Sequence, residues 1–190
     1  RYWLVRRGKT EDGRIFTGTQ FGAVGQTLGE AVFSTGMSGY QETLTDPSYH
    51  RQVVIATAPH IGNTGWHDED SESSRIWVAG YVVRDAARIS SSWRSRRDLE
   101  FELRAQGIVG MCEVDTRALT RHIRERGAMR MGVSSVETSA AALLERVQAE
   151  AKPTGASITL IGNGELVAES VTPLGAGTPR VVLEFPNVRS

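Results

Sequence analysis

The sequence predicts an α/β domain, and three patterns support that class. Short aromatic and β-branched runs separated by glycines fill the first fifty positions and are typical of strands joined by turns. Two compact apolar runs, Val53 to Thr57 and Ile76 to Val83, have the length and composition of buried central strands. From about Ser95 onward, charged residues alternate with apolar ones at spacings of three and four, which indicates helices.

The first half should consist of short strands and one helical turn. We expect strands from Tyr2 to Val5, from Ile15 to Phe21 and from Glu30 to Phe33. Tyr40 to Leu44 can form a short helix, and the Asp46-Pro47 pair predicts a turn. The glycines expected at the turns between the strands are Gly8, Gly13, Gly22, Gly25 and Gly29.

The second half should alternate between helices and strands. The segment around Leu99, Phe101 and Leu103 has a period of two, but Ser95 followed by Asp98 resembles a helix start, so we expect a helix there. Two strands follow, from Ile108 to Val114 and from Met129 to Val133. We expect them to pair in parallel, because a helix lies between them.

That intervening helix is the best defined by its sequence. Asp115 can cap its first turn, Leu119, His122 and Ile123 share one face, and Gly127 can end it. Arg124 and Arg126 suit the negative end of the helix. A last helix is expected from Ser139 to Glu150, with Leu143, Leu144 and Val147 facing inward.

The end of the chain changes in composition. Glycine and proline recur between residues 153 and 180, as in a linker, and Val181 to Phe185 is an isolated strand signal. Such a strand either docks on an existing sheet or begins another domain. We expect a domain over residues 1–152, a linker over 153–180, and the start of a further domain at 181–190.

Composition excludes several functional classes. The 190 residues are 39% hydrophobic and 23% charged, as in a folded protein. Lys plus Arg and Asp plus Glu are equal at 22 each, so no net field attracts nucleic acid or an anionic membrane. No apolar run approaches the ~20 residues of a membrane span. Cys112 is the single cysteine, which suits a reducing compartment. We expect a cytoplasmic protein without nucleic-acid or membrane partners.

Polar residues that can carry chemistry are densest between Thr35 and Ser48. This segment, T-G-M-S-G-Y-Q-E-T-L-T-D-P-S, gathers hydroxyl and amide groups around flexible glycines. The alternative is that Thr45, Asp46 and Ser48 only satisfy backbone groups around the turn.

Other candidate residues have a structural explanation that we prefer. His60, in P-H-I-G-N-T-G, is favoured as a hydrogen-bonded structural histidine over a general base. Cys112 is favoured as a packed thiol over a nucleophile, because its neighbours are apolar. The acidic run Asp68 to Glu72 lacks the order of a calcium loop and is favoured as solvated. Three arginines beside Trp93 resemble a nucleic-acid patch, but acidic residues follow at once and favour pairing along a helix face: Arg94, Arg96 and Arg97.

Several long motifs together carry a specific resemblance. They are E-D-G-R-I-F-T-G at Glu11, G-E-A-V-F-S-T-G-M-S-G-Y-Q-E-T-L-T-D-P-S-Y at Gly29, P-H-I-G-N-T-G at Pro59, G-Y-V-V-R-D at Gly80, and D-T-R-A-L-T-R-H-I-R-E-R-G at Asp115. In order and spacing the series closely resembles the amino-terminal domain of the small (glutaminase) subunit of carbamoyl-phosphate synthetase. The resemblance covers residues 1 to about 135, and extends more loosely to 190.

The resemblance implies a fold and a role. The fold is a three-layer β/β/α swivelling domain, with mixed sheets and flanking helices. In that family the small subunit hydrolyses glutamine with a Cys-His-Glu triad in a second, glutaminase domain, which the strand at 181–190 would begin. Ammonia then passes to the large subunit, which makes carbamoyl phosphate for pyrimidine or arginine biosynthesis. The resemblance implies no catalytic residue, metal or cofactor in this chain, and places ATP and Mg on the large subunit.

The resemblance also assigns three site residues. Ser48 matches a residue that touches glutamine in the neighbouring glutaminase domain, and its hydroxyl can orient an amide. Met37 and Asp46 match positions near the ammonia path at the subunit contact. The implied partners are the large subunit, the glutaminase domain and glutamine at the shared site.

Three departures from the family pattern leave alternatives open. Arg6 to Thr10 looks like an insertion, Gly36 stands where serine is common, and Pro186 falls where glycine is usual. The second hypothesis is therefore a free-standing scaffold or binding protein that kept the fold after losing the glutaminase domain. A third is a hydrolase that uses His60 and Asp46.

Overall fold

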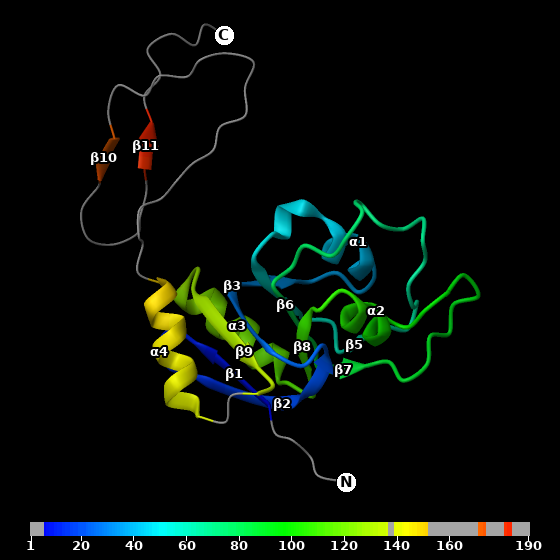
Figure 1. The fold of residues 1–190 in the computed structure, drawn as a ribbon, viewed down its shortest axis with the longest axis horizontal. Helices are drawn as coiled ribbons and strands as arrows, with labels where there is room; N and C mark the ends of the chain where they lie inside the picture. Colours follow the sequence, from blue (N-terminus) through cyan, green and yellow to red (C-terminus); the bar gives the residue numbers. More distant parts are fainter. Residues whose placement is uncertain (1–5, 137–138, 152–170, 174–180, 184–190) are drawn as a thin grey trace, which may run out of the picture. The chain divides into compact units, whose positions relative to one another are not determined.

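A barrel of seven strands forms the centre of the computed structural model, which describes residues 6–136, 139–151, 171–173 and 181–183 (Figure 1). Around the barrel the strands follow the order β1-β2-β8-β6-β4-β3-β9, and β9 closes the ring onto β1. Their bounds are β1 Arg6–Thr10, β2 Ile15–Gly22, β3 Gln26–Ser34, β4 Gln52–Ala56, β6 Gly80–Val82, β8 Val109–Cys112 and β9 Arg130–Ser134.

The strand directions divide the barrel into two parts. β3, β4, β6 and β8 are parallel neighbours, with Val32 opposite Val54 and Val82 opposite Met111. The remaining pairs, which involve β1, β2 and β9, are antiparallel. The carboxyl ends of the four parallel strands therefore meet at one edge of the barrel, where the chain turns after each strand.

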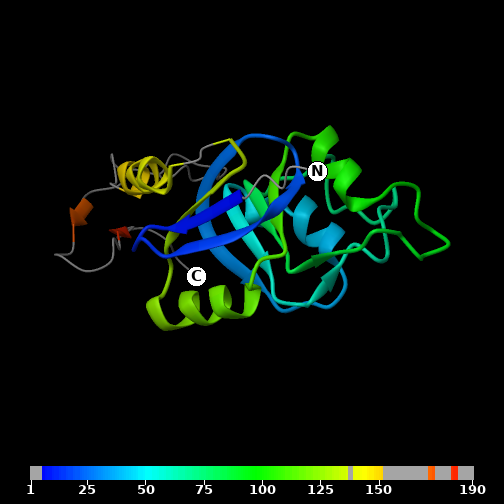
Figure 2. The ribbon, with the colours of Figure 1, turned by 90° about the horizontal axis from the view of Figure 1, so that it is seen from below.

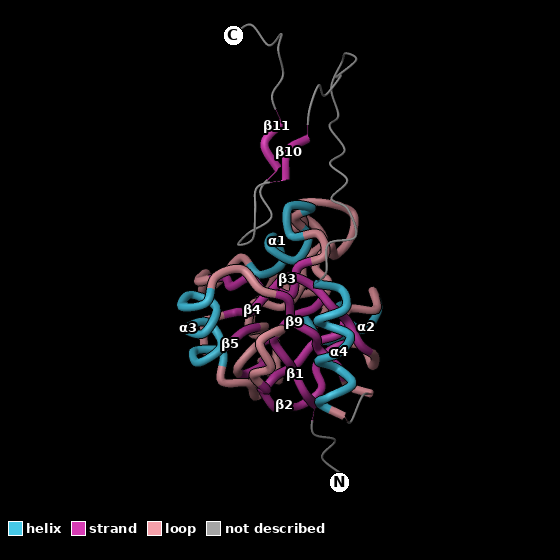
Figure 3. The backbone as a smooth tube through the Cα atoms, turned by 90° about the vertical axis from the view of Figure 1, so that its left-hand side faces the viewer, coloured by secondary structure: helices cyan, strands magenta, loops and turns pink. Residues whose placement is uncertain are grey.

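Four helices lie in the described ranges, and three of them pack on particular strands of the barrel. α2 contacts β2 and β8, α3 contacts β3 and β4, and α4 contacts β1 and β9. Figures 2 and 3 show α3 and α4 on opposite sides of the barrel. No helix in the described ranges is long and apolar enough to cross a membrane. The helices are α1 Tyr40–Thr45, α2 Leu99–Ala105, α3 Thr116–Arg126 and α4 Ala140–Ala151, and a 3-10 turn, η1, covers Pro47–Tyr49.

Local signals for the helices are confirmed. The Asp115 carboxylate accepts a hydrogen bond from the Ala118 N–H at 3.0 Å, and Gly127 ends α3 with a φ of 89°. The apolar face of α3 is buried as expected. The helix at residue 99 is also confirmed, although Asp98, not Ser95, caps it, by accepting from the Phe101 N–H at 2.6 Å.

The core has two parts on opposite faces of the central strand β4. Val54 and Ala56 belong to a cluster that includes Leu44 of α1 and Leu103 of α2. Val53 and Ile55 belong to the other cluster, which contains Leu119 of α3 and Met131 of β9. Because side chains alternate along a strand, a strand buried on both faces reads as a continuous apolar run, and the expectation of a buried strand at 53–57 is confirmed.

A close contact fixes α4 on the barrel. A Cβ atom at Gly132 would lie 2.8 Å from Val147 Cγ2, so the helix approaches β9 as closely as glycine permits. The buried Lys9 of β1 donates a hydrogen bond from Nζ to the Ala140 carbonyl oxygen at 3.1 Å. Leu143 and Val147 are buried, as predicted, while Leu144 is half-buried.

Some expectations from the sequence are wrong. The strands on either side of α3 do not pair: β8 lies between β2 and β6, and β9 lies between β1 and β3 in antiparallel directions. Arg6 to Thr10, which looks like an insertion beside the family pattern, forms strand β1 and pairs on both sides, so strand register is kept there. Gly29 lies inside β3, where a side chain would collide with the Arg51 carbonyl oxygen.

The predicted α/β class, with mixed strand directions and flanking helices, is confirmed. The finer three-layer arrangement stays a prediction. Of the expected buried run at 76–83, only 80–82 form a strand. β5 (His60–Ile61) and β7 (Asp85–Ala86) form a separate two-stranded parallel sheet.

The described end of the chain is a unit of its own. β10 (Val171–Pro173) and β11 (Val181–Leu183) pair in antiparallel directions. The strand signal at 181 thus has a partner within the segment expected to be a linker. The expected strand from Tyr2 to Val5 and the position of Pro186 lie outside the described residues, and the division at 152 and 180 stays a prediction.

Candidate functional site

The polar segment from Thr35 to Ser48 is held firmly by its helix, α1. Tyr40 and Leu44 are buried in the core. The Tyr40 hydroxyl donates to the Gly65 carbonyl oxygen at 2.6 Å and accepts from the Thr64 hydroxyl at 2.8 Å. Burial raises the pKa of this phenol, so it stays a neutral donor.

A second set of hydrogen bonds ties α1 to the polar loop that follows β5. The His67 N–H donates to Gln41 Oε1 at 2.9 Å. The Thr45 hydroxyl accepts from the Glu72 N–H at 2.9 Å, and the Thr45 carbonyl accepts from the Ser73 hydroxyl at 2.6 Å. For Thr45, the structural interpretation of this polar cluster is therefore confirmed.

Asp46 and Ser48 form the turn after α1. Asp46 accepts a hydrogen bond from the Ser48 N–H at 2.8 Å and so caps η1. Hydrogen bonds from the backbone and the side chain of Ser48 hold the pKa of the Asp46 carboxyl below its usual value. Ser48 itself lies at an exposed position, so the turn presents a serine fixed by a charged neighbour.

Met37 stands apart from this pair. It is 82% exposed and lies before α1, whereas Asp46 and Ser48 follow it. Gly39, with a φ of 75°, makes the turn into the helix between them. The structure thus brings Asp46 and Ser48 together and places Met37 at the opposite end of the same helix.

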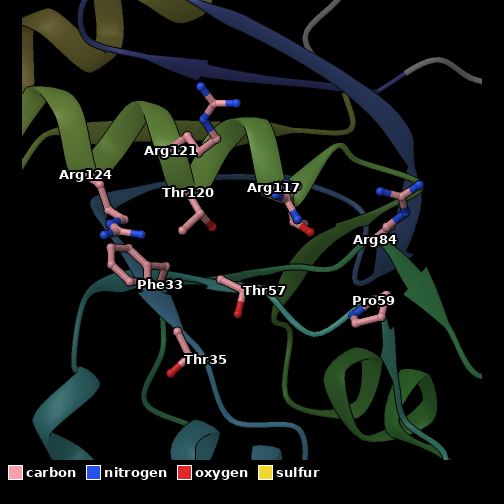
Figure 4. Close-up of a pocket in the computed structure, with 10 residues that line it drawn as sticks. Phe33, Thr35, Thr57, Pro59, Arg84, Arg117, Thr120, Arg121 and Arg124 are labelled. Atoms are coloured by element: carbon pink, nitrogen blue, oxygen red, sulfur yellow. The ribbon is translucent and has the colours of Figure 1, made fainter.

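A groove of about 600 Å³ lies at the edge where the parallel strands end (Figure 4). We call it the arginine groove. Thr35 follows β3, Thr57 follows β4, Arg84 follows β6, and α3 follows β8. The parallel pairing of these strands is what gathers the lining from distant parts of the chain. The lining residues are Phe33, Thr35, Thr57, Pro59, Arg84, Thr116, Arg117, Thr120, Arg121 and Arg124.

Arginines on the rim are the dominant feature of this groove. Arg117, Arg121 and Arg124 come from one face of α3, and Arg84 comes from the other end of the groove (Figure 4). None of the four forms an ion pair with another residue in the described ranges. The sequence reasoning missed this site, although the spacing of i, i+4 and i+7 along α3 was a usable signal.

Other charged residues seen in the sequence neutralise one another. Arg94 donates to Asp70 Oδ1 at 2.9 Å, and Arg97 pairs with Asp68 and, at 2.8 Å, with Glu102 Oε2. The acidic run is therefore not merely solvated, because it binds the arginine segment across from it. We call Arg94 and Arg97, with their carboxylate partners, the paired arginine cluster.

His60 and Cys112 have ordinary structural surroundings. His60 Nδ1 lies 3.0 Å from Asp85 Oδ2, so it is hydrogen-bonded as predicted, and its partner is Asp85, not the Asp46 of the hydrolase hypothesis. Cys112 is half-buried at the end of β8, and burial raises the pKa of its thiol to about 11. At neutral pH this sulfur is protonated and a poor nucleophile, in agreement with the packing interpretation.

Comparisons with known proteins agree with the resemblance seen in the sequence. Residues 9–133 match the model of the family described as carbamoyl-phosphate synthase small chain, CPSase domain. The chain is 74% identical over 125 residues to the carbamoyl phosphate synthase small chain of Streptomyces coelicolor, covering 66% of this chain and 33% of the relative.

Mycobacterial small chains match over longer stretches. That of Mycobacterium tuberculosis is 62% identical over 152 residues, which cover 78% of this chain and 40% of the relative. That of Mycobacterium leprae is 57% identical over 173 residues, which cover 87% and 46%. The chain thus spans between a third and just under half of the length of these curated relatives.

Proposed function

Because the chain belongs to the carbamoyl-phosphate synthase small-chain family, we propose that it is the non-catalytic, site-completing and subunit-contact domain of a glutamine-hydrolysing carbamoyl-phosphate synthase. Glutamine is hydrolysed in an adjoining glutaminase domain, and the ammonia passes to a large subunit that makes carbamoyl phosphate for pyrimidine or arginine biosynthesis. ATP and Mg act on that large subunit.

The observation that carries this role is the exposed Ser48 held by Asp46. The Ser48 hydroxyl donates a hydrogen bond to the Asp46 carboxylate, which leaves the hydroxyl oxygen as an acceptor for another group. An acceptor at this position suits the N–H groups of a glutamine amide or ammonium. The hydrogen bond to Asp46 holds the Ser48 turn before substrate arrives, so little ordering entropy is lost on binding.

Met37 suits the proposed subunit contact. Its side chain is almost fully exposed, on a segment fixed by the buried Tyr40. An exposed thioether on a rigid support fits an irregular apolar surface well. We place Met37 at the contact with the large subunit, and Asp46 beside the path that ammonia follows.

The chemistry of Cys112 supports the non-catalytic part of the proposal. Glutamine hydrolysis through a thioester requires a thiolate, and the single cysteine of this chain has its thiol pKa raised to about 11. The chain therefore needs a nucleophile from another domain.

The two-part core supports the proposed three-layer architecture. Alternate residues of β4 pack in opposite directions, one set toward α1 and α2 and the other toward the barrel interior and α3. We propose that these two cores separate the layers of the β/β/α swivelling fold.

The test compares two nitrogen sources in a complex of the chain, its glutaminase domain and the large subunit. We expect Ser48→Ala to raise the KM for glutamine about five- to tenfold, as for loss of one hydrogen bond. Carbamoyl phosphate formation from added ammonia should stay unchanged. Ser74→Ala is the control, because Ser74 is also an exposed serine on a loop.

Two results would contradict the proposal. One is glutaminase activity in the purified chain without the other components. The other is an equal loss of glutamine- and ammonia-dependent rates in a folded Ser48→Ala variant, which would show that Ser48 does not act on glutamine. If no large subunit binds the chain at micromolar concentration, the free-standing scaffold becomes the better hypothesis.

A further inference from the structure

We propose that the arginine groove is the docking site for an acidic surface segment of the large subunit. This inference rests on the proposed function, and adds to it the surface and the chemistry of the contact. Most of the lining lies within the motifs quoted above, but no single motif reveals the groove, because the lining comes from four separate segments of the chain.

The arginines of the groove have no carboxylate partner in the described part of the chain. The whole chain carries equal numbers of basic and acidic residues, 22 of each, yet four arginines line this one cavity without an ion-pair partner in the described ranges. In the paired arginine cluster, by contrast, Arg94 and Arg97 each bind a carboxylate within the chain. The guanidinium groups of the groove are therefore available to carboxylates of another molecule.

The arrangement of the arginines favours an extended partner over a small anion. Arg117 and Arg124 are seven residues apart on α3, which is ~10 Å along a helix axis. In Figure 4 the side chain of Arg121 points away from Thr57, whereas that of Arg124 lies beside Phe33. A single phosphate needs guanidinium groups that converge on one point. Groups spread along two helical turns match a row of carboxylates.

The helix that presents these arginines is rigid. Asp115 caps its first turn, and Leu119 and Ile123 anchor its opposite face in the core. The arginine positions are exposed, so the charges are available to a partner. A rigid helix fixes where these side chains begin, so no backbone ordering is needed when the guanidinium groups pair.

The groove adjoins the proposed subunit contact. Thr35 lines the groove, and Met37 follows two residues later on the same segment. A large-subunit surface that covers Met37 would therefore reach the groove by continuing along the same edge of the barrel. Phe33 and Pro59 give the floor an apolar part that such a partner can bury.

The experiment measures the affinity of the chain for the large subunit at several NaCl concentrations. We expect Arg117→Glu/Arg121→Glu to weaken binding at least tenfold at low salt, because like charges would then face each other. Arg117→Gln/Arg121→Gln should weaken it less, and should flatten the dependence of affinity on salt. Circular dichroism and thermal unfolding verify that each variant is folded.

The control is Arg88→Glu/Arg96→Glu, which makes the same change in net charge at two exposed arginines outside the groove lining. It should change affinity less than threefold. A complex that forms normally and is insensitive to both groove variants, or that responds equally to the control, overturns the docking site but leaves the proposed function standing. Failure of the unaltered chain to bind the large subunit overturns both.

A small-anion site is the remaining outcome. Such a site would be shown if inorganic phosphate raised the Tm of the isolated chain and if the Arg117→Gln/Arg121→Gln variant no longer showed that rise. In that case the same variant would bind the large subunit as tightly as the unaltered chain. That result would also overturn the docking proposal.

Discussion

The two groups of arginines on this domain differ in their partners within the described part of the chain. In the paired arginine cluster, Arg94 and Arg97 bind the acidic loop between β5 and β6 and the helix α2. In the arginine groove, four arginines meet no carboxylate in the described part of the chain. A sequence shows both groups as basic residues near acidic ones. Their partners distinguish charge used to hold the fold from charge available for recognition.

The largest effect on stability should come from the part of the core that contains Leu44 of α1. Leu44 is fully buried between α1 and the central strands, so Leu44→Ala should lower the free energy of unfolding by about 2–5 kcal/mol. Urea denaturation measures the change, with the exposed Val24→Ala as control. A decrease in the free energy of unfolding of less than about 1 kcal/mol would mean that the packing of α1 is not needed for the fold.

A smaller effect should come from the cap that supports the groove. Asp115→Ala removes the acceptor for the Ala118 N–H and should lower stability by about 1 kcal/mol. Asp115→Asn should be nearly neutral, because asparagine caps helices equally well. Equal losses in both variants would assign the role to the charge of Asp115 and not to its hydrogen bond.

Truncating one arginine from each group tests whether only the paired arginines stabilise the fold. Arg97→Ala should cost less than about 1 kcal/mol, as expected for a partly exposed ion pair. Arg121→Ala should leave stability within about 0.5 kcal/mol of the original chain. A double-mutant cycle of Arg97 with Glu102 should recover a coupling energy. If Arg121→Ala is the more costly change, the groove arginines are structural.

The smallest effect concerns Asp46, another charge satisfied within the chain. When the carboxyl carbon of Asp46 is followed by NMR through a pH titration, the pKa should lie below the usual 3.8. Since the folded pKa is the lower one, the stabilisation is present above the unfolded value and is lost as pH falls through the folded value. Ser48→Ala should raise the pKa of Asp46, while Ser74→Ala should not change it.

Local features of the fold were predictable, and long-range ones were not. The α3 helix follows from Asp115, Gly127 and the residues between them, all within a dozen positions. The pairing of β8 and β9 was predicted wrongly, because a strand's neighbours are decided by distant segments. Gly29 resembles a turn glycine in the sequence, because a glycine required by the close approach of the Arg51 carbonyl looks the same there.

The candidate site divides in the same way. The segment from Thr35 to Ser48 could be recognised from its motif, and the structure shows how Asp46 holds Ser48. The arginine groove could not be assembled from the sequence, because Thr57, Arg84 and Arg117 meet only when parallel strands bring their carboxyl ends to one edge.

Closure of the seven-stranded barrel has a consequence for how this domain meets other proteins. In an open sheet the outer strand exposes unpaired backbone groups, to which a foreign strand can add. The ring β1-β2-β8-β6-β4-β3-β9 has no outer strand, so the backbone of the barrel itself offers no template for aggregation or for strand exchange. Association with this barrel is thereby left to helix faces and loops, whose side chains discriminate between partners in a way that backbone pairing does not.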